Sequence, residues 1–258
     1  WAKYPPSVSY WQNGSDTWDN YQSYLPSVID FPFSSSVSTA FGSYSEPHKI
    51  REIYFTFARD WIYPDPENNV IFLDNHDTNR FYTTVGNDMR KYKLGLAMLM
   101  VSRGVPQLYY GAEINLYGDR SSGGDADIRK DFPGGWPGDK HNAFAQKGRT
   151  PEENDLWDFC SLLLNWRKNK PVIHKGKTMQ FVPTNRHTYV LVRYDDTDAV
   201  CLIINPLDEE IVFGMDRIAE VTGSEDQYKD VMDGKIRFSV ANSNTVFDDY
   251  SMVLIVMT

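Results

Sequence analysis

The chain has 258 residues, of which 41% are hydrophobic and 24% charged, a composition typical of a globular protein with one large domain or two ordinary ones. A formal net charge of −9 repels phosphate backbones and argues against a nucleic-acid partner. No apolar run is long enough to predict a membrane span, and the first residues show neither a methionine nor a signal-peptide pattern, so we expect the chain to begin inside a longer protein.

The first third of the chain predicts short elements separated by irregular segments. Residues 1–26 are rich in Ser, Tyr, Trp and Asn and predict no regular structure. A short apolar strand is expected over 28–32, ended by a proline, and helices over 35–41 and 46–59. The apolar run 70–73 predicts the next strand.

The middle of the chain alternates between helix and strand. Residues 88–102 carry apolar side chains at helical spacing, and Gly104 with Pro106 predicts the end of that helix. A further strand is expected over 105–113. Strand–helix–strand alternation of this length indicates parallel α/β architecture. The glycine-rich segment 114–151 predicts a long loop, and loops of that length are usually functional or disordered.

A second helix follows the loop, with Thr150 or Asn154 near its start and Pro171 at its end. Beyond residue 172 the pattern changes to short β-branched runs separated by turn residues, which predicts a small antiparallel β domain. The runs cover 189–192, 199–204, 210–213 and 251–256. Cys160 and Cys201 both fall on apolar stretches, which favours buried free thiols over a disulfide.

Polar side chains follow the strand at 70–73 directly, in the order Asp74-Asn75-His76-Asp77 and then Thr78-Asn79-Arg80-Phe81. In a (β/α) barrel the strand interior is packed with apolar residues and the chemistry lies at the carboxyl ends of the strands. The letters N-H-D followed by T-N-R-F closely resemble the fourth conserved motif of the α-amylase family of retaining glycoside hydrolases (family 13). The resemblance implies that Asp77 grips the sugar ring being cleaved and that His76 assists it.

The resemblance extends along the chain. Residues 28–32 are similar to the sixth barrel strand, 70–77 to the seventh and 104–113 to the eighth, while 128–136 more weakly resembles the neopullulanase and cyclomaltodextrinase-like enzymes of bacteria. The implied fold class is α/β. Residues 1–171 would form the C-terminal part of a (β/α)₈ TIM barrel, and residues 172–258 would form a small antiparallel β-sandwich domain.

The family cleaves α-1,4-glucosidic bonds in starch-like glucans, pullulan or cyclodextrins by double displacement, with one carboxylate as nucleophile and another as general acid/base. Both belong to the fourth and fifth barrel strands, so the resemblance places them upstream of Trp1, which would stand just after the acid/base. We therefore expect the isolated chain to be inactive and the preceding half barrel to be its partner, together with α-glucan. No cofactor is expected in this chain; calcium is possible in the preceding part, and a periplasmic or extracellular location is favoured.

Each site residue also has a plainer interpretation. Asp77 could be a helix cap or a turn former, and Arg80 either holds a neighbouring carboxylate or faces solvent. Asn75 is expected to contact substrate beside His76. A metal site made of residues 74–77 is disfavoured, because successive strand residues point to opposite faces.

The long loop supplies the remaining candidates. Tyr117, Asp119, Arg129 and Trp136 are expected to line outer sugar subsites. Trp136 stands between glycines and prolines, so we expect it to be exposed, as a stacking platform or as part of loop packing. Tyr110 and Glu113 could serve the site or the packing of the strand end, and His141 and His187 show no partner pattern and are taken as surface residues.

Three alternatives to a hydrolase stay open. The parent protein could be a non-catalytic glucan-binding protein, which would bind oligosaccharide without turnover. It could be a transglycosylase or isomerase of the same family, which only product analysis separates from a hydrolase. The β domain could also act as a docking module.

Overall fold

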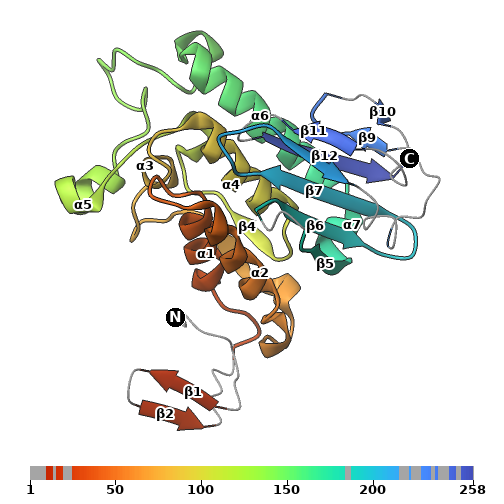
Figure 1. Ribbon diagram of the computed structural model, residues 1–258. Coiled ribbons are helices and arrows are strands. Elements are labelled where there is room, and N and C mark those ends of the chain that lie inside the picture. The colour runs from red at the N-terminus through yellow and green to blue at the C-terminus, as the bar shows by residue number, and fades with distance from the viewer. Residues whose placement is uncertain are drawn as a thin grey trace.

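The computed structural model describes residues 10–13, 16–19, 25–183, 187–214, 221, 228–233, 236–237, 244–247 and 251–257. A parallel β/α segment forms the first part, and an antiparallel sheet forms the second (Figure 1). Helix α4 (Met89–Val101) lies between the two and packs against helices of the first part and against two strands of the antiparallel sheet. Within the described ranges, no helix combines the length and the apolar character needed to cross a bilayer.

The barrel-like segment is built on parallel strands. β3 (Val70–Phe72) pairs in parallel with β4 (Val105–Gln107), and Ile29 forms a parallel bridge to Val70 on the other side of β3. α4 is the crossover between β3 and β4, as the sequence predicted. The order of these three chain segments is that of consecutive strands in a (β/α) barrel.

The strand expected over 28–32 is reduced to the bridge at Ile29. Helix α1 (Phe31–Phe41) begins four residues before the predicted position, because Asp30 accepts a hydrogen bond from the Phe33 N–H at 3.0 Å and Pro32 lies in the first turn. Proline fits the first turn of a helix because its missing N–H has no partner there. Pro32 therefore starts the helix, which corrects the prediction that it ends a strand.

The helices expected next are confirmed, with a 3₁₀ turn, η1 (Pro47–Ile50), leading into α2 (Arg51–Phe57). Two further 3₁₀ turns, η2 (Asp60–Ile62) and η3 (Pro66–Asn68), connect α2 to β3. α4 is capped by Asp88, whose carboxylate accepts from the Arg90 N–H at 2.9 Å.

The segment predicted as a long loop contains helix α5 (Arg120–Ile128), and the strand predicted over 105–113 ends at Gln107. Asp119 caps α5 by accepting from the Ser121 N–H at 2.9 Å. The helix was missed because its serines and glycines are weak helix formers, and Gly124 interrupts it with a φ of 65°. The 3₁₀ turns η4 (Ala112–Ile114) and η5 (Gln146–Gly148) flank it.

Helix α6 (Pro151–Lys168) begins with a capping box, in which Thr150 accepts from the Glu153 N–H and the Glu153 carboxylate accepts from the Thr150 N–H. Pro171, predicted only to end α6, also begins a short helix, α7 (Pro171–Lys175). His141 is not a lone surface histidine, since its Nε2 lies 2.9 Å from the Glu153 carboxylate.

The second part of the chain is a six-stranded antiparallel sheet with the order β10-β9-β12-β7-β6-β5. Its strands are β5 (Lys177–Phe181), β6 (Tyr189–Tyr194), β7 (Ala199–Asn205), β9 (Tyr228–Asp230), β10 (Ile236–Arg237) and β12 (Ser251–Met257). A second, two-stranded sheet pairs β8 (Ile211–Gly214) with β11 (Asn244–Phe247). The four predicted runs are confirmed as β6, β7, β8 and β12, whereas β5, β9, β10 and β11 were not predicted.

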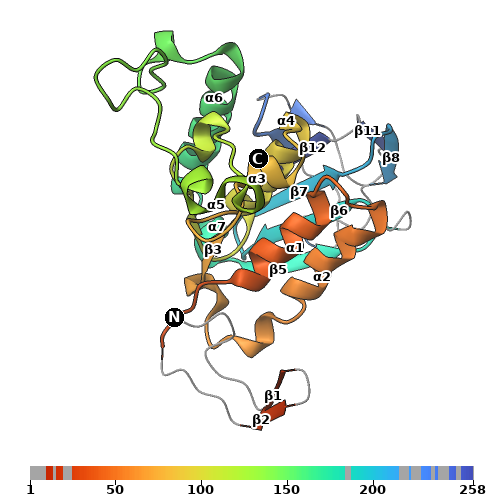
Figure 2. The ribbon, with the colours of Figure 1, turned by 90° about the vertical axis from the view of Figure 1, so that its left-hand side faces the viewer.

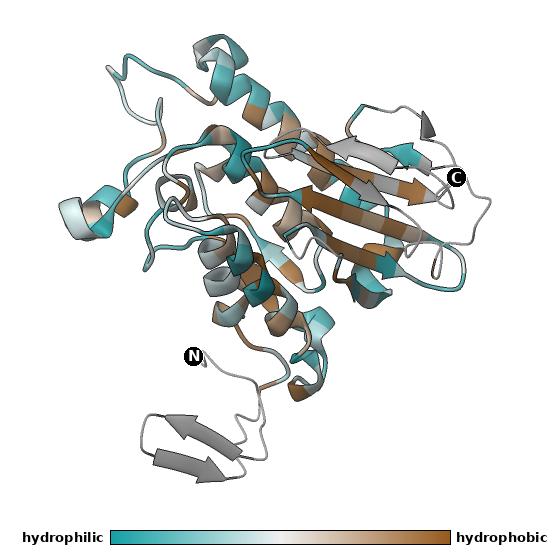
Figure 3. Ribbon diagram, viewed as in Figure 1, coloured by the Kyte–Doolittle hydropathy of each residue, from teal (hydrophilic) through white to brown (hydrophobic). Residues whose placement is uncertain are grey.

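β6 and β7 are mainly apolar (Figure 3), although β6 carries Arg193, and β7 is buried throughout. Both cysteines are free and buried, as predicted, and burial raises the pKa of the Cys160 thiol to about 12. Residues 10–19, predicted as irregular, include a hairpin of β1 (Tyr10–Asn13) and β2 (Asp16–Asp19).

The two parts are joined by specific hydrogen bonds. The Tyr54 hydroxyl on α2 lies 2.6 Å from the Phe181 carbonyl and accepts from the Val190 N–H at 3.2 Å. Arg193 on β6 forms an ion pair of 2.8 Å with Glu67 on η3. These contacts hold α2 and η3 beside β5 and β6, at one edge of the sheet (Figure 2).

A buried ionic cluster lies where α4 leads into β4. The Arg103 guanidinium pairs with Asp30 at 2.7 Å and with Asp60, and both Arg103 and Asp30 are fully buried. Arg167 of α6 reaches the same turn and donates to the carbonyls of Met100, Ser102 and Gly104. The cluster therefore fixes the end of α4 and the start of β4.

Candidate functional site

The site begins where β3 ends. Ile71 and Phe72 are fully buried, and the chain then turns outward through residues 74–80. Asp74 stays inside: its carboxylate is 4% exposed and accepts from the Phe81 N–H at 2.8 Å, at the start of helix α3 (Phe81–Thr84). Burial raises the pKa of Asp74 to about 6, although the Phe81 N–H and Arg80 oppose the rise. Asp74 thus anchors the loop.

Asn75 shapes the next turn. Its side-chain oxygen accepts from the Asp77 N–H at 2.8 Å, and its own N–H donates to the Thr78 hydroxyl at 3.0 Å. This is an Asx turn, which fixes the backbone without using regular secondary structure. Asn75 is 6% exposed, so its clearest role in this structure is to set the direction of His76 and Asp77.

Asp77 and His76 face outward together. The Asp77 side chain is 43% exposed, and its two carboxylate oxygens lie 3.4 Å from His76 Nε2 and 3.4 Å from Arg129 Nη2. Arg129 is tied down by a shorter bond from its Nε to the His76 carbonyl, at 2.9 Å. The carboxylate is therefore oriented from both sides by long contacts that leave most of its hydrogen-bonding capacity open.

Helix α5 docks on this loop at its other end as well. Arg120 donates from Nη1 to the Asp77 carbonyl at 2.9 Å, and its backbone N–H donates to Asn79 at 2.8 Å. Asn79 in turn donates to the Asp119 carboxylate at 3.1 Å. Hydrogen bonds from the Ser121 hydroxyl and the Ser121 N–H hold the pKa of the Asp119 carboxyl below its usual range.

The Asp125 carboxylate links Arg120, which begins α5, to Arg129, which directly follows it. Asp125 lies 2.9 Å from Arg120 Nε and 2.9 Å from Arg129 Nη2. Asn79, Arg120 and Asp125 were not singled out from the sequence. Asn79 belongs to the T-N-R-F motif and was the one with a local signal, whereas the other two lie in the segment mistaken for a loop.

Arg80 points the opposite way, into the protein. It is 1% exposed and donates to the carbonyls of Ile128 at 2.9 Å and Tyr110 at 2.6 Å. Its guanidinium lies 4.0 Å from the centre of the Tyr109 ring. Of the two interpretations of Arg80, the solvent-facing one does not hold, and its hydrogen-bond acceptors in the described part of the chain are carbonyls rather than a carboxylate.

The aromatic side chains of Tyr117 and Trp136 lie at the surface. Tyr117 is 59% exposed, with the Lys130 ammonium 3.9 Å from its ring centre. Trp136 is 63% exposed, as predicted, and donates from Nε1 to Asp131 at 2.9 Å. The structure thus gathers His76, Asp77, Asp119 and Arg129 in one network and places Tyr117 and Trp136 outside it.

The described ranges contain no group of three His, Cys, Asp or Glu side chains placed to hold a metal ion. The possibility of calcium in the part that precedes this chain stays an inference from the resemblance.

A parallel β/α segment with exposed charged side chains after a strand end is the arrangement of part of a (β/α) barrel, and an antiparallel β domain follows it here. The family profile described as "Alpha amylase, catalytic domain" matches residues 10–158, more than half of the chain. The profile described as "Cyclo-malto-dextrinase C-terminal domain" matches residues 178–254. The chain belongs to the α-amylase family.

Individual relatives agree with this assignment. A cyclomaltodextrin glucanotransferase of Niallia circulans is 32% identical over 155 residues, covering 60% of this chain and 18% of the relative. A cyclomaltodextrinase of a Bacillus species is 27% identical over 186 residues, covering 69% of this chain and 29% of the relative. The chain therefore spans less than a third of the length of these curated relatives.

A solved structure shows the same fold. The α-amylase of Geobacillus thermoleovorans, crystallised with acarbose, superposes with a TM-score of 0.69 at 19% identity. The match covers 90% of this chain and 48% of that one. Both parts of this chain, the barrel segment and the β domain, therefore follow the fold of an α-amylase.

Proposed function

We propose that this chain supplies the transition-state-stabilising carboxylate, Asp77, of an enzyme that cleaves α-1,4-glucosidic bonds in starch-like glucans, pullulan or cyclodextrins. The observation that carries the proposal is the Asp77 carboxylate itself. It follows a barrel strand, is 43% exposed, and is oriented by His76 on one side and Arg129 on the other. Family membership supports the same role.

The chemistry follows from what a carboxylate can accept. Each oxygen of Asp77 can take a hydrogen bond from one of two vicinal sugar hydroxyls. Such charge-assisted bonds strengthen as the ring flattens and positive charge develops at the anomeric carbon. An interaction that is stronger in the transition state than in the ground state raises kcat.

The neighbouring residues take supporting roles in this proposal. His76 donates to a sugar hydroxyl, and Asn75 holds His76 and Asp77 in register by accepting from the Asp77 N–H. Arg129 and Asp119 border the next sugar unit along the glucan. Tyr117 and Trp136, both exposed, offer stacking faces for more distant units, and Arg80 supports the site from beneath.

The rest of the catalytic machinery is proposed to come from residues that precede Trp1. The nucleophile and the general acid/base would stand on barrel strands that this chain does not contain. The partial coverage of the relatives and of the solved amylase supports this division. On this proposal the preceding half barrel is the partner of this chain, and the parent enzyme acts on polysaccharide in the periplasm or outside the cell.

The test compares the 258-residue chain with the same chain extended by the residues encoded before Trp1. The extended protein is expected to release reducing sugar from soluble starch, and the 258-residue chain alone is expected to release none. Hydrolysis by the pure 258-residue chain, in a sample free of a second polypeptide, would overturn the proposed division of catalytic residues.

A second candidate is a transferase of the same family, favoured by the relatives that are named cyclomaltodextrin glucanotransferase. Every residue of the Asp77 site would serve both reactions. Chromatography of the products from soluble starch separates them, because a transferase yields cyclic or elongated glucans and a hydrolase yields short linear ones.

A further inference from the structure

Tyr44 stands on the turn that leaves α1, and its side chain is almost fully exposed, at 99%. The backbone around it is held firmly. The Gly42 N–H donates to Ser38 at 2.9 Å, the Ser43 N–H to Thr84 at 3.0 Å and the Ser45 N–H to Gly42 at 2.9 Å. The turn therefore presents an aromatic ring to solvent from a fixed backbone.

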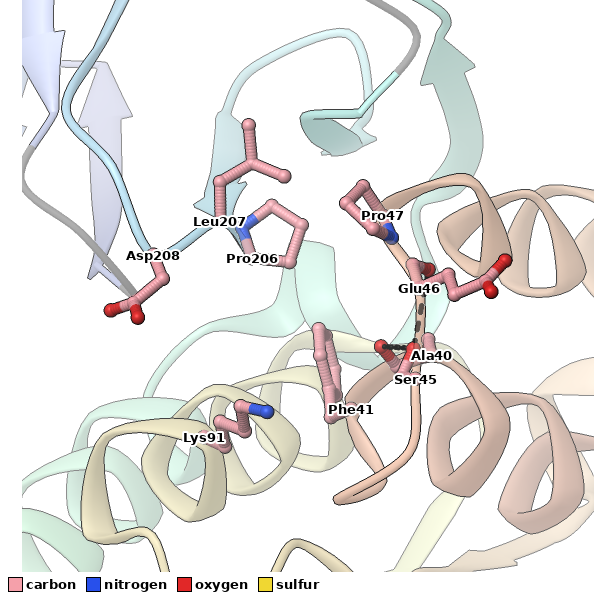
Figure 4. Close-up of a pocket in the computed structure, with 9 residues that line it drawn as sticks. All are labelled: Ala40, Phe41, Ser45, Glu46, Pro47, Lys91, Pro206, Leu207 and Asp208. Atoms are coloured by element: carbon pink, nitrogen blue, oxygen red, sulfur yellow. Dashed lines mark hydrogen bonds between the residues drawn. The ribbon is translucent and has the colours of Figure 1, made fainter.

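A hydrogen bond from a side chain also holds this turn. The Ser45 hydroxyl donates to the Ala40 carbonyl at 2.7 Å, as the dashed lines in Figure 4 show. A Cβ at Gly42 would lie 2.6 Å from the Ser38 carbonyl oxygen, so the close turn requires glycine there.

Beside Tyr44 lies a hollow of about 300 Å³, at the small end of the range for small-molecule sites. The polar side-chain groups in its lining are hydroxyls and one ammonium, with no carboxylate, and apolar atoms make up the rest of the surface. The lining consists of Ser38, Thr39, Gly42, Ser43, Tyr44, Ser45, Lys49 and Thr84.

Several of these polar groups are open to a ligand. In the described part of the chain, the hydroxyls of Ser38, Thr39 and Ser43 and the Lys49 ammonium make no hydrogen bond or ion pair. A flat aromatic face beside free hydroxyls suits a ligand with an apolar ring face and many hydroxyls. The lack of lining carboxylates disfavours a cationic ligand.

The cavity on the opposite side of this turn is different. It measures about 150 Å³ and is walled by Phe41, Pro47, Pro206 and Leu207, with charged Glu46, Lys91 and Asp208 around them (Figure 4). Three charged side chains around so small a cavity do not match a neutral polyhydroxyl ring. The two hollows share only Ser45, so the hydroxyl-lined one is a distinct surface feature.

We propose that the hollow beside Tyr44 is a second, non-catalytic site for an uncharged α-glucan chain. One sugar ring stacks on the Tyr44 ring, and its hydroxyls bond to Ser38, Thr39, Ser43 and Lys49. The site is distinct from the Asp77 site in its residues: Thr84, which ends helix α3, lines the hollow, and none of residues 74–80 does. The choice of glucan as ligand rests on the proposed function.

The test measures retardation of the 258-residue chain in native gels containing soluble starch, together with calorimetric titration by maltohexaose. Tyr44→Ala is expected to weaken starch binding at least fivefold, whereas Tyr44→Phe keeps it within about twofold. Trp61→Ala is the matched control, because Trp61 is also well exposed, at 79%, but does not line the hollow. All three variants change exposed side chains and should keep the wild-type melting temperature.

Two results would overturn the proposed site: a wild-type chain that starch does not retard, or a Tyr44→Ala variant retarded as strongly as the wild type. Asp77→Asn separates this proposal from the function proposed above. If Asp77→Asn abolishes starch binding and Tyr44→Ala leaves it unchanged, the second site is wrong and the role of Asp77 survives. If Tyr44→Ala weakens binding while Asp77→Asn leaves the extended enzyme fully active, the second site stands and the role of Asp77 is wrong.

Discussion

Two clusters of arginine and aspartate in this chain differ mainly in burial. In the buried ionic cluster at the start of β4, called the base cluster below, Arg103 is fully buried and pairs with Asp30 at 2.7 Å and with Asp60. In the loop cluster, Asp77 and Arg129 are 43% and 41% exposed and lie 3.4 Å apart. The same residue types therefore form a closed, saturated contact in one place and an open, loosely bonded one in the other.

The difference shows which carboxylates are available for binding. A buried carboxylate whose acceptor sites are filled by a guanidinium has nothing left for a ligand, and removing its partner leaves an uncompensated charge. An exposed carboxylate with long contacts contributes little to stability but can accept hydrogen bonds from substrate. Burial and contact length, rather than residue type, separate the closed cluster from the one that is open to a ligand.

The largest expected effect is on the base cluster. Arg103→Leu should lower the free energy of unfolding by about 3–5 kcal/mol, because Asp30 and Asp60 would lose the guanidinium that compensates them. Urea unfolding followed by circular dichroism measures the change. A loss below about 1 kcal/mol would show that the base cluster is no more structural than the loop cluster.

Asp74 gives a pH-dependent prediction. Its pKa of about 6 in the folded chain lies above the ordinary value of about 3.9, so its carboxyl stabilises the fold most below pH 4, and this contribution is lost as the pH rises through 6. Asp74→Asn should remove up to about 3 kcal/mol of this fall between pH 4 and pH 7.

Thermal unfolding of the wild-type chain and of Asp74→Asn at several pH values measures how much of the fall in stability Asp74 causes. Burial also raises the pKa of Asp60 and Glu67, so part of the slope should remain in the variant. An unchanged slope after Asp74→Asn would contradict the burial assigned to Asp74.

Arg80 connects the two kinds of environment, because it is buried yet supports the exposed site. Arg80→Leu should cost about 2 kcal/mol, since the carbonyls of Ile128 and Tyr110 would lose a charged donor. Limited proteolysis should then cut faster within 119–129. Arg80→Lys, which keeps the charge but not the planar fork, should recover only part of the loss.

The smallest effects are expected in the loop cluster itself. Arg129→Ala should change the free energy of unfolding by less than about 1 kcal/mol, because both partners are well exposed. A loss as large as that for Arg103→Leu would remove the distinction between the clusters. Urea unfolding under the same conditions makes the comparison direct.

The features that the sequence predicted correctly depend on local patterns. The apolar run at 70–73 predicted β3, and helical spacing predicted α4 and α6. The alternation of apolar runs beyond residue 172 gave the main strands of the antiparallel domain. In each case the signal lies within about 20 residues of chain.

The features that were missed depend on contacts between distant segments. α5 has weak helix-forming residues and is held largely by bonds from Arg120 and Arg129 to the loop at 76–79. The burial of Arg80 depends on Tyr109 and Ile128, which lie 29 and 48 residues away along the chain. Propensity and periodicity do not report such contacts, because packing between segments overrides both.

The most direct test of the central claim is the turnover of Asp77→Asn beside Asp74→Asn, in the protein extended by the residues encoded before Trp1. The two changes are chemically identical and three positions apart, but one alters the exposed carboxylate and the other the buried anchor. We predict that Asp77→Asn lowers kcat on maltohexaose by at least about 1,000-fold, a loss of about 4 kcal/mol of transition-state stabilisation, whereas Asp74→Asn keeps kcat within about tenfold. An Asp77→Asn enzyme with near wild-type kcat would contradict the account.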